Sequence, residues 1–345
     1  MFYFLLLMIQ MNQISQIQEF FKERLCENII IKEKEDKKLI IQSNYPIQFL
    51  KKELQKNFPK IQFEFDIIIP MAPTQLPGFM IKNIHNAIAV VSGKGGVGKS
   101  TVSCNLAIAS QILGARVGLL DADIYGPSLP TMMGIHEKPK VSEDNRYIPP
   151  KAFDIECMSM GLLQEAGPLI WRGPMLAKAL IQMLDQTAWS TLDYLFLDLP
   201  PGTGDIPLSL IQKIPLSGAI IVTTPQTIAT LDAEKAIEMF LKTNVPILGI
   251  IANMAWHECQ NCHHQNFIFG QDGAKELAKR YQLPILGEIP LNSDIRKTSD
   301  EGLPIAAQNQ HPLANVWLNA ALKTTQILSQ KANSQKSKFP PIRKE

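Results

Sequence analysis

The nine residues at positions 93–101 constrain the fold of this chain more than any other part of its sequence. They read Gly-Lys-Gly-Gly-Val-Gly-Lys-Ser-Thr and fit the pattern G-x-x-x-x-G-K-[ST]. An apolar run at 87–91 precedes them, and a helical pattern at 102–113 follows them. A strand, a glycine-rich loop and a helix in this order predict a phosphate-binding loop in an α/β domain.

The residue types of this loop match the chemistry of nucleotide binding. Glycines let backbone N–H groups turn toward phosphate oxygens, and the helix that follows adds its positive end. Lys99 can reach the β- and γ-phosphates of ATP, and the Ser100 hydroxyl can ligate Mg²⁺. We expect the whole loop to contact the nucleotide: Gly93, Lys94, Gly95, Gly96, Val97, Gly98, Lys99, Ser100 and Thr101.

Carboxylates follow two other apolar runs. Asp121 and Asp123 come directly after the run at 117–120, and Asp198 ends the run at 194–197. Carboxyl ends of parallel strands are where such sheets bind ligands, so we expect Asp198 to hold the Mg²⁺ shell and Asp121 to lie near the ion. The glycine- and proline-rich stretch 199–205 is typical of a switch loop that senses the γ-phosphate.

The apolar runs also predict the architecture of the larger domain. Five runs of four or five residues alternate with helical patterns at 102–113, 175–188 and 231–243. Strands buried on both faces look like this, so the sequence predicts a doubly wound α/β fold with a mostly parallel sheet. The runs lie at 87–91, 117–120, 194–197, 219–222 and 247–251.

Four segments are expected along the chain. Residues 1–70 form a small α+β domain with helices at 14–26 and 49–57 and strands at 39–42 and 61–69. A proline-rich linker at 71–84 leads to the ATPase domain at 85–328, and the polar, basic end at 329–345 is predicted to be disordered.

Composition and charge exclude several classes of function. The net charge of +2 argues against a dedicated nucleic-acid surface. The apolar run at 1–9 is too short to span a membrane, and the basic C-terminal end lacks apolar residues at helical spacing, so no membrane partner is expected. Five cysteines are too few and too uneven for a disulfide framework, which favours the cytoplasm.

Cys259 and Cys262 form a C-x-x-C, which supplies two thiolates where a zinc or cubane site needs four ligands. Nearby histidines could complete a zinc site within one chain, namely His257, His263 or His264. A two-fold axis could instead bring two copies of the pair together. A redox disulfide is the third alternative. Cys104 and Cys157 lie in or beside apolar stretches and are expected in the core.

Lys94 and Lys99 together resemble the deviant Walker A loop of the family that includes ParA, MinD, the nitrogenase iron protein and the Mrp/ApbC proteins. This resemblance implies a nucleotide-sandwich homodimer in which Lys94 reaches the phosphates of the partner. It also implies that Asp123 orients the attacking water and that Asn253 hydrogen-bonds adenine.

The resemblance narrows to the Mrp/ApbC iron–sulfur carrier ATPases over residues 85–325. It rests on the loop, 121–128, Trp171-Arg172-Gly173-Pro174, 197–205 and 253–270. It implies slow, dimer-dependent ATP hydrolysis and a 4Fe–4S cluster held at the dimer interface by Cys259 and Cys262. The cluster would come from donor proteins and pass to apo iron–sulfur client proteins. The alternatives are a ParA/MinD-type positioning ATPase and an ATPase with a structural zinc.

Two features depart from that family. Gln260 and His263 stand where its members usually have a proline between the cysteines and a glycine after them. The N-terminal domain lacks the Asp-Pro-Glu of many bacterial members, and Cys26 falls in a predicted helix. We therefore expect a degenerate N-terminal domain in which Cys26 has no function.

Overall fold

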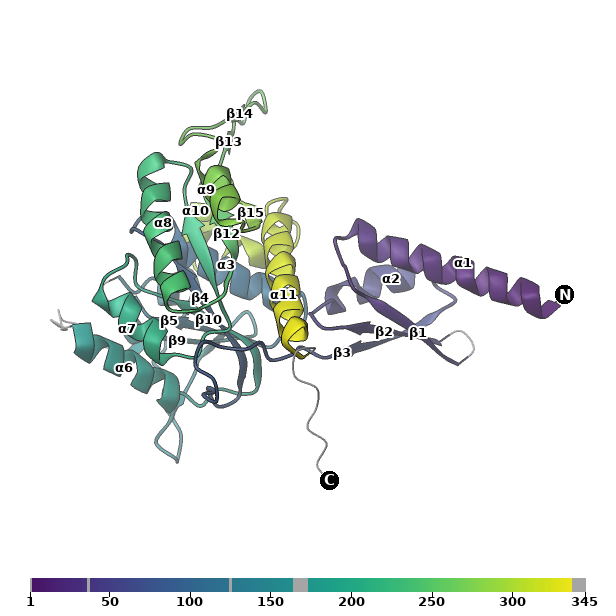
Figure 1. Ribbon diagram of the computed structural model, residues 1–345, viewed down its shortest axis with the longest axis horizontal. Coiled ribbons are helices and arrows are strands. Elements are labelled where there is room, and N and C mark those ends of the chain that lie inside the picture. The colour runs from purple at the N-terminus through teal and green to yellow at the C-terminus, as the bar shows by residue number, and fades with distance from the viewer. Residues whose placement is uncertain (1, 36–37, 124–125, 164–172, 337–345) are drawn as a thin grey trace. The chain divides into compact units, whose positions relative to one another are not determined.

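The computed structural model describes residues 2–35, 38–123, 126–163 and 173–336. The chain divides into two compact units, Met1–Pro70 and Met71–Glu345. Figure 1 shows the elements of each unit along the chain.

The first unit packs two helices against a three-stranded sheet. Its elements are α1 (Phe2–Glu23), β1 (Ile30–Glu35), β2 (Lys38–Ser43), η1 (Gln48–Leu50), α2 (Lys51–Asn57) and β3 (Gln62–Ile67). The strand order is β1-β2-β3, with β1 antiparallel and β3 parallel to β2. Ile17 and Phe21 of α1, Ile41 of β2 and Leu54 of α2 are buried and belong to its core.

The helix expected at 14–26 ends earlier than predicted, at Glu23. Leu25 has a φ of 59°, in the left-handed region that stops a helix. Cys26 therefore lies after α1, where it is buried, and desolvation raises the pKa of its thiol to about 12. β1 was not predicted, because its sequence Ile-Ile-Lys-Glu-Lys-Glu has no apolar alternation.

The second unit is built on an eight-stranded sheet, which confirms the predicted doubly wound fold. Its order is β15-β12-β11-β4-β10-β5-β9-β8, and every neighbouring pair is parallel except β8–β9. The strands are β4 (Ile84–Val91), β5 (Val117–Asp121), β8 (Lys151–Ala152), β9 (Ile155–Ser159), β10 (Leu192–Asp198), β11 (Gly218–Thr223), β12 (Ile247–Ala252) and β15 (Ile285–Glu288).

Helices cover both faces of this sheet (Figure 1). Successive side chains of a strand point to opposite faces. One core cluster contains residues of α6, α7, α8 and α9 together with Ala87, Ala89 and Val91 of β4. The alternate residues Ile88 and Val90 are equally buried but lie outside that cluster, on the other face of the sheet. The helices are α3 (Lys99–Ile112), α4 (Leu129–Met132), α5 (Met160–Leu163), α6 (Gly173–Gln186), α7 (Asp205–Lys213), α8 (Thr227–Lys242), α9 (Gly273–Tyr281), α10 (Ser293–Asp300), η2 (Ile305–Ala307) and α11 (Ala314–Lys336).

Two small two-stranded ribbons complete the unit. One pairs β6 (Lys140–Val141) with β7 (Tyr147–Ile148), and the other pairs β13 (His257–Glu258) with β14 (Gln265–Asn266). The second ribbon projects from one end of the unit, above α8 and α9 (Figure 1).

The two ends of this unit differ from expectation. The segment 71–84 is not a loose linker, because Gln75 bonds to the backbone at both Ile214 and Leu216 and the Ala72 amide donates to Asn86. Residues 329–336, expected to be disordered, are instead helical, since α11 continues to Lys336. Leu328 and Ala332 are buried at helical spacing and extend the packed face of α11. Residues 337–345 lie outside the described part.

No helix among the described residues is both long and apolar enough to cross a membrane.

Candidate nucleotide and metal-cluster site

The phosphate loop joins the carboxyl end of β4 to the first turn of α3. Gly98 caps α3 in the left-handed region, with a φ of 80° that a residue with a side chain rarely adopts. A Cβ at Gly98 would also overlap the side-chain amide of Asn253, and one at Gly93 would overlap the backbone of Asp232. Glycine is therefore required by both conformation and space at position 98, and by space at position 93.

Lys99 and Asp198 form the centre of the site. Lys99 Nζ lies 2.7 Å from Asp198 Oδ1 and 3.9 Å from Asp123 Oδ2, and both Lys99 and Asp198 are almost fully buried. Ser100 donates to the second oxygen of Asp198 at 2.6 Å, and Ser103 donates to the first at 2.7 Å. The Asp198 carboxylate, expected to hold the Mg²⁺ shell, thus accepts hydrogen bonds from Ser100 and Ser103 and forms an ion pair with Lys99.

Asp121 lies on the neighbouring strand in register with Asp198. Its carboxylate accepts from the Asp123 and Leu129 amides and from the Ser159 hydroxyl. Burial, and then the charge of Asp198, raise the pKa of Asp121 to about 7. The structure therefore brings together the three predicted acids, Asp121, Asp123 and Asp198, around the first turn of α3.

The donors of the loop fit a polyphosphate with Mg²⁺. Lys99 Nζ is buried but has no hydrogen-bond geometry toward any described acceptor, so its contact with Asp198 is an ion pair without an aligned N–H. Space is open around the Cα atoms of Gly95 and Gly96. A phosphate oxygen would supply the missing acceptor, and the Ser100 and Asp198 oxygens are hard ligands suited to Mg²⁺.

Lys94 is partly exposed, and its carbonyl accepts from the Ser92 hydroxyl at 2.9 Å. The Ser92 carbonyl in turn accepts from the Gly202 amide at 2.9 Å, which ties the expected switch loop to the phosphate loop. Asp205 is exposed at the start of α7. No ion pair joins Lys94 to another described residue within the chain, so its ammonium group is available to a partner.

A cavity of ≈ 510 Å³ adjoins the loop, and we call it the base cavity after the role proposed for it. Its lining comes from Gly98 and Thr101, from Asn253 and Met254 after β12, from residues 290–292 after β15, and from residues of 127–132 and α10. The side chain of Asn253 also bonds the phosphate loop, because its Nδ2 donates to the Val97 carbonyl at 2.8 Å. Asn253 therefore braces the phosphate loop as well as lining the base cavity.

Cys259 and Cys262 lie in the tip of the β13–β14 ribbon. The Cys259 amide donates to the His264 carbonyl, and the His263 amide donates to the Cys259 carbonyl. The turn is tight, since His263 has a φ of 56°. Backbone N–H groups of Cys262 and Asn261 point at the Cys259 sulfur and lower the pKa of its thiol. Cys262 is exposed, and Cys259 is partly exposed. The turn therefore leaves both cysteines at least partly accessible to solvent.

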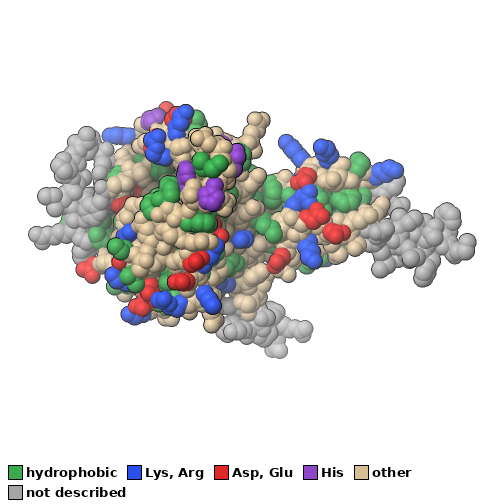
Figure 2. Space-filling view, turned by 90° about the horizontal axis from the view of Figure 1, so that it is seen from above, with side chains coloured by type: hydrophobic (Ala, Val, Ile, Leu, Met, Phe, Trp, Pro, Cys, Tyr) green, Lys and Arg blue, Asp and Glu red, His purple; other side chains and the backbone are tan. Residues whose placement is uncertain are grey.

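The described residues do not complete a metal site within one chain. No three side chains among His, Cys, Asp and Glu are grouped as metal ligands in the part of the chain that the structure describes. His263 instead pairs its Nδ1 with Glu258 at 2.8 Å. Figure 2, which looks down on this end of the unit, shows histidines interspersed with hydrophobic side chains on the surface.

The other cysteines are structural. Cys104 of α3 and Cys157 of β9 are buried, and desolvation raises the pKa of the Cys157 thiol to about 12 and that of Cys104 well above its usual value. Trp171 and Arg172 of the predicted motif lie outside the described residues.

Sequence reasoning missed two side chains of the site. Ser103 stands one helical turn after Lys99, so its hydroxyl reaches the same carboxylate. The i, i+4 spacing could have revealed it. Ser159 bonds Asp121 from β9, a strand that was not predicted, and no local signal marks it.

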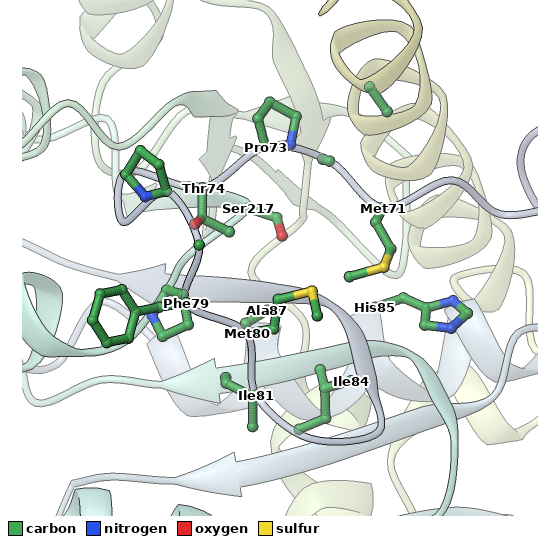
Figure 3. A pocket seen from close by; sticks show the side chains of 15 residues that line it. Met71, Pro73, Thr74, Phe79, Met80, Ile81, Ile84, His85, Ala87 and Ser217 are labelled. Atoms are coloured by element: carbon green, nitrogen blue, oxygen red, sulfur yellow. The ribbon is translucent and has the colours of Figure 1, made fainter. Parts of the chain in front are cut away.

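A larger cavity, of ≈ 820 Å³, lies at the opposite, amino-terminal ends of β4 and β11. It is enclosed by the segment that includes Met71, Pro73, Phe79 and Met80, with His85 at one side (Figure 3). Its walls are mainly apolar and carry neither a glycine loop nor a cation cluster.

The fold and the loop define a P-loop NTPase of the ParA/MinD type. A sequence model of the ParA family described as "NUBPL iron-transfer P-loop NTPase" matches residues 83–325, and the chain belongs to this family. A solved nucleotide-binding protein from Archaeoglobus fulgidus, in complex with ADP, is similar at 41% identity and a TM-score of 0.59, covering 69% of this chain and 92% of that one.

Two curated relatives are similar over most of the second unit. An iron-sulfur cluster carrier protein of Pseudomonas fragi is 48% identical over 267 residues, which is 76% of this chain and 92% of the relative. An iron-sulfur cluster transfer protein NUBPL of Mus musculus is 50% identical over 260 residues, 74% of this chain and 81% of the relative. A cell-division ATPase MinD of Pyrococcus furiosus, at 20% identity and a TM-score of 0.54 over 70% of this chain and 99% of that one, shares the fold.

Proposed function

We propose that this protein is an ATP-hydrolysing carrier that holds a 4Fe–4S cluster between two copies of the chain and delivers it to apo-proteins. The observation that carries the proposal is the incomplete thiolate pair. Cys262 is exposed and Cys259 partly exposed on a projecting turn, and the described residues supply no third ligand. Cluster ligation needs four thiolates, which a two-fold axis supplies from two copies.

Nucleotide binding is assigned to the loop and its adjoining cavity. Lys99 would exchange its ion pair with Asp198 for a phosphate oxygen, which frees the Asp198 carboxylate for the shell of Mg²⁺. Ser100 would ligate Mg²⁺ directly, with Asp121 nearby. Adenine would occupy the cavity beside Asn253, where the side-chain oxygen can accept from the adenine amino group while Nδ2 stays on Val97.

Hydrolysis is assigned to Asp123 and to a second copy of Lys94. The Asp123 carboxylate lies 3.9 Å from the Lys99 ammonium, beside the position where the γ-phosphate would lie, and would orient the attacking water. Lys94 would stabilise the transition-state charge on the partner's nucleotide. A site that is complete only in the dimer hydrolyses ATP slowly and in proportion to the dimer present.

Cluster donors and apo iron–sulfur clients are the proposed protein partners. Thiolates held at an exposed turn can be approached by the thiolates of another protein, and a cluster shared between two chains can be released when they separate. This explains why a carrier, rather than a redox enzyme, would keep its ligands at the surface.

Anaerobic reconstitution with iron and sulfide tests the assignment. The expected product absorbs broadly near roughly 400 nm, as thiolate-ligated clusters do. Cys259→Ala with Cys262→Ala should remove this absorbance, and Cys157→Ala serves as the matched control because its thiol is buried. If the double variant forms the same chromophore as the wild type, the cluster does not reside on this turn.

A further inference from the structure

The base cavity and the cysteine turn are joined by a short stretch of chain, residues 253–256, which we call the connector. β12 ends at Ala252, and β13 begins at His257, two residues before Cys259. The connector is thus the only covalent path from the phosphate-loop end of β12 to the first thiol. Its first two residues, Asn253 and Met254, also line the base cavity.

The connector is fixed to the nucleotide site at its start. Asn253 is buried, its amide donates to Thr223 of β11 at 2.8 Å, and its side chain donates to Val97 of the phosphate loop at 2.8 Å. The close approach of Gly98 leaves no room for the Asn253 side chain to shift toward the loop. Asn253 therefore holds the start of the connector at a fixed position beside the phosphate loop.

Met254 has a φ of 54°, a left-handed conformation that costs free energy for a side-chain-bearing residue. The residues after it are held from the other side of the cavity. Ala255 donates to the Ile289 carbonyl at 2.8 Å, and the Leu291 amide donates to the Trp256 carbonyl at 2.7 Å. Leu291 and Pro290 form the opposite wall of the base cavity.

Two parts of the cavity lining, the phosphate loop and the turn at 290–291, are consequently close to or bonded to the segment that supports the thiols. We propose that the connector is a coupling element, in which Asn253 and Met254 act as positioning residues that make the cysteine turn respond to a bound base. This inference rests on the proposed nucleotide function and adds the route by which it reaches the cluster ligands. A nucleobase in the cavity packs against Met254 and Leu291 together. It therefore restricts the motion of the residues from which the β13–β14 ribbon projects.

Amide hydrogen exchange of residues 257–266 in the metal-free chain tests this coupling. ADP should slow exchange of the ribbon amides by about three- to tenfold, the effect of about one added hydrogen bond on local opening. Pyrophosphate with Mg²⁺ occupies the phosphate loop without a base and should leave the ribbon within about twofold of the unbound chain.

Two variants separate coupling from binding. At saturating ADP, exchange of the ribbon amides should slow in neither Asn253→Ala nor Met254→Gly. Met254→Gly keeps Lys99, Ser100 and the bond from Asn253 to Val97, so it should still bind pyrophosphate. Asn105→Ala is the matched control, since Asn105 is a buried asparagine that bonds the Thr101 carbonyl and the Ala306 amide but does not line the cavity. It should keep the response to ADP.

The possible results distinguish the two proposals. If the wild-type chain binds neither ADP nor pyrophosphate, the proposed function fails. If ADP binds without slowing the ribbon amides, if pyrophosphate slows them equally, or if both connector variants keep the response, the coupling role is overturned. Where Asn253→Ala does not fold, Met254→Gly alone decides, because it keeps the bond from Asn253 to Val97.

Discussion

Replacing Lys99 by alanine should destabilise the nucleotide-free protein, in addition to abolishing nucleotide binding. Lys99 is buried beside Asp198, with Asp123 at 3.9 Å, and Asp121 lies on the adjacent strand. Removing one member of a buried pair costs about 3–5 kcal/mol. The lower end applies, because the Ser100 and Ser103 hydroxyls still donate to the Asp198 carboxylate.

A loss of about 3 kcal/mol corresponds to a fall in Tm of about 6 °C for a unit of this size. Tryptophan fluorescence in EDTA measures it selectively, because all four tryptophans lie in the second unit. Lys94→Ala is the matched control. It removes a partly exposed lysine with no ion pair to the described residues and should change stability by less than about 0.5 kcal/mol.

Adding Asp198→Asn to Lys99→Ala should restore at least about half of the lost stability, since it removes the uncompensated charge while keeping the side-chain volume. An unchanged Tm in Lys99→Ala, or no recovery in the double variant, would contradict the view that Lys99 neutralises a buried carboxylate before nucleotide binds.

Three further outcomes are expected. At pH 8 a thiol reagent should label Cys259 and Cys262 rapidly. Cys26, Cys104 and Cys157 should stay unmodified until denaturant is added, because burial raises the pKa of their thiols. Rapid labelling of all five cysteines would contradict the burial of these three. Ser103→Ala should lower the free energy of unfolding by about 2 kcal/mol but keep the affinity for Mg–ATP, measured by calorimetry, whereas Ser100→Ala should lose that affinity. Equal losses of affinity in the two variants would mean that Ser100 does not ligate Mg²⁺. Lys94→Ala should bind ATP normally and hydrolyse it at least about tenfold more slowly; normal turnover would remove the cross-dimer role.

Much of the second unit could be predicted because its central strands are continuous apolar runs. β4, β5, β10, β11 and β12 each extend an expected run by only a few residues. β9 was missed because Glu156 interrupts it; that side chain is buried, where it accepts from the Ser190 amide and pairs with Lys151. Long-range partners of this kind leave no local pattern.

The residues of the site likewise divide into those that the sequence predicts and those that only tertiary contacts bring together. The loop, the acids and the C-x-x-C are recognisable from spacing, because their chemistry requires particular residues at fixed intervals. The bond from Asn253 to Val97 joins positions 156 residues apart, and only the parallel pairing of β12, β11 and β4 brings them together. Resemblance suggested a base contact for Asn253, but it did not reveal that the same side chain braces the loop.

The most direct test of the carrier assignment is the stoichiometry of the anaerobically reconstituted protein. Native mass and iron and sulfide analysis should find a dimer with about two iron and two sulfide per chain, which is one 4Fe–4S cluster for two C-x-x-C turns. A monomer that binds about one zinc per chain, or a dimer that retains iron and sulfide without Cys259 and Cys262, would contradict a cluster shared between two copies of this turn.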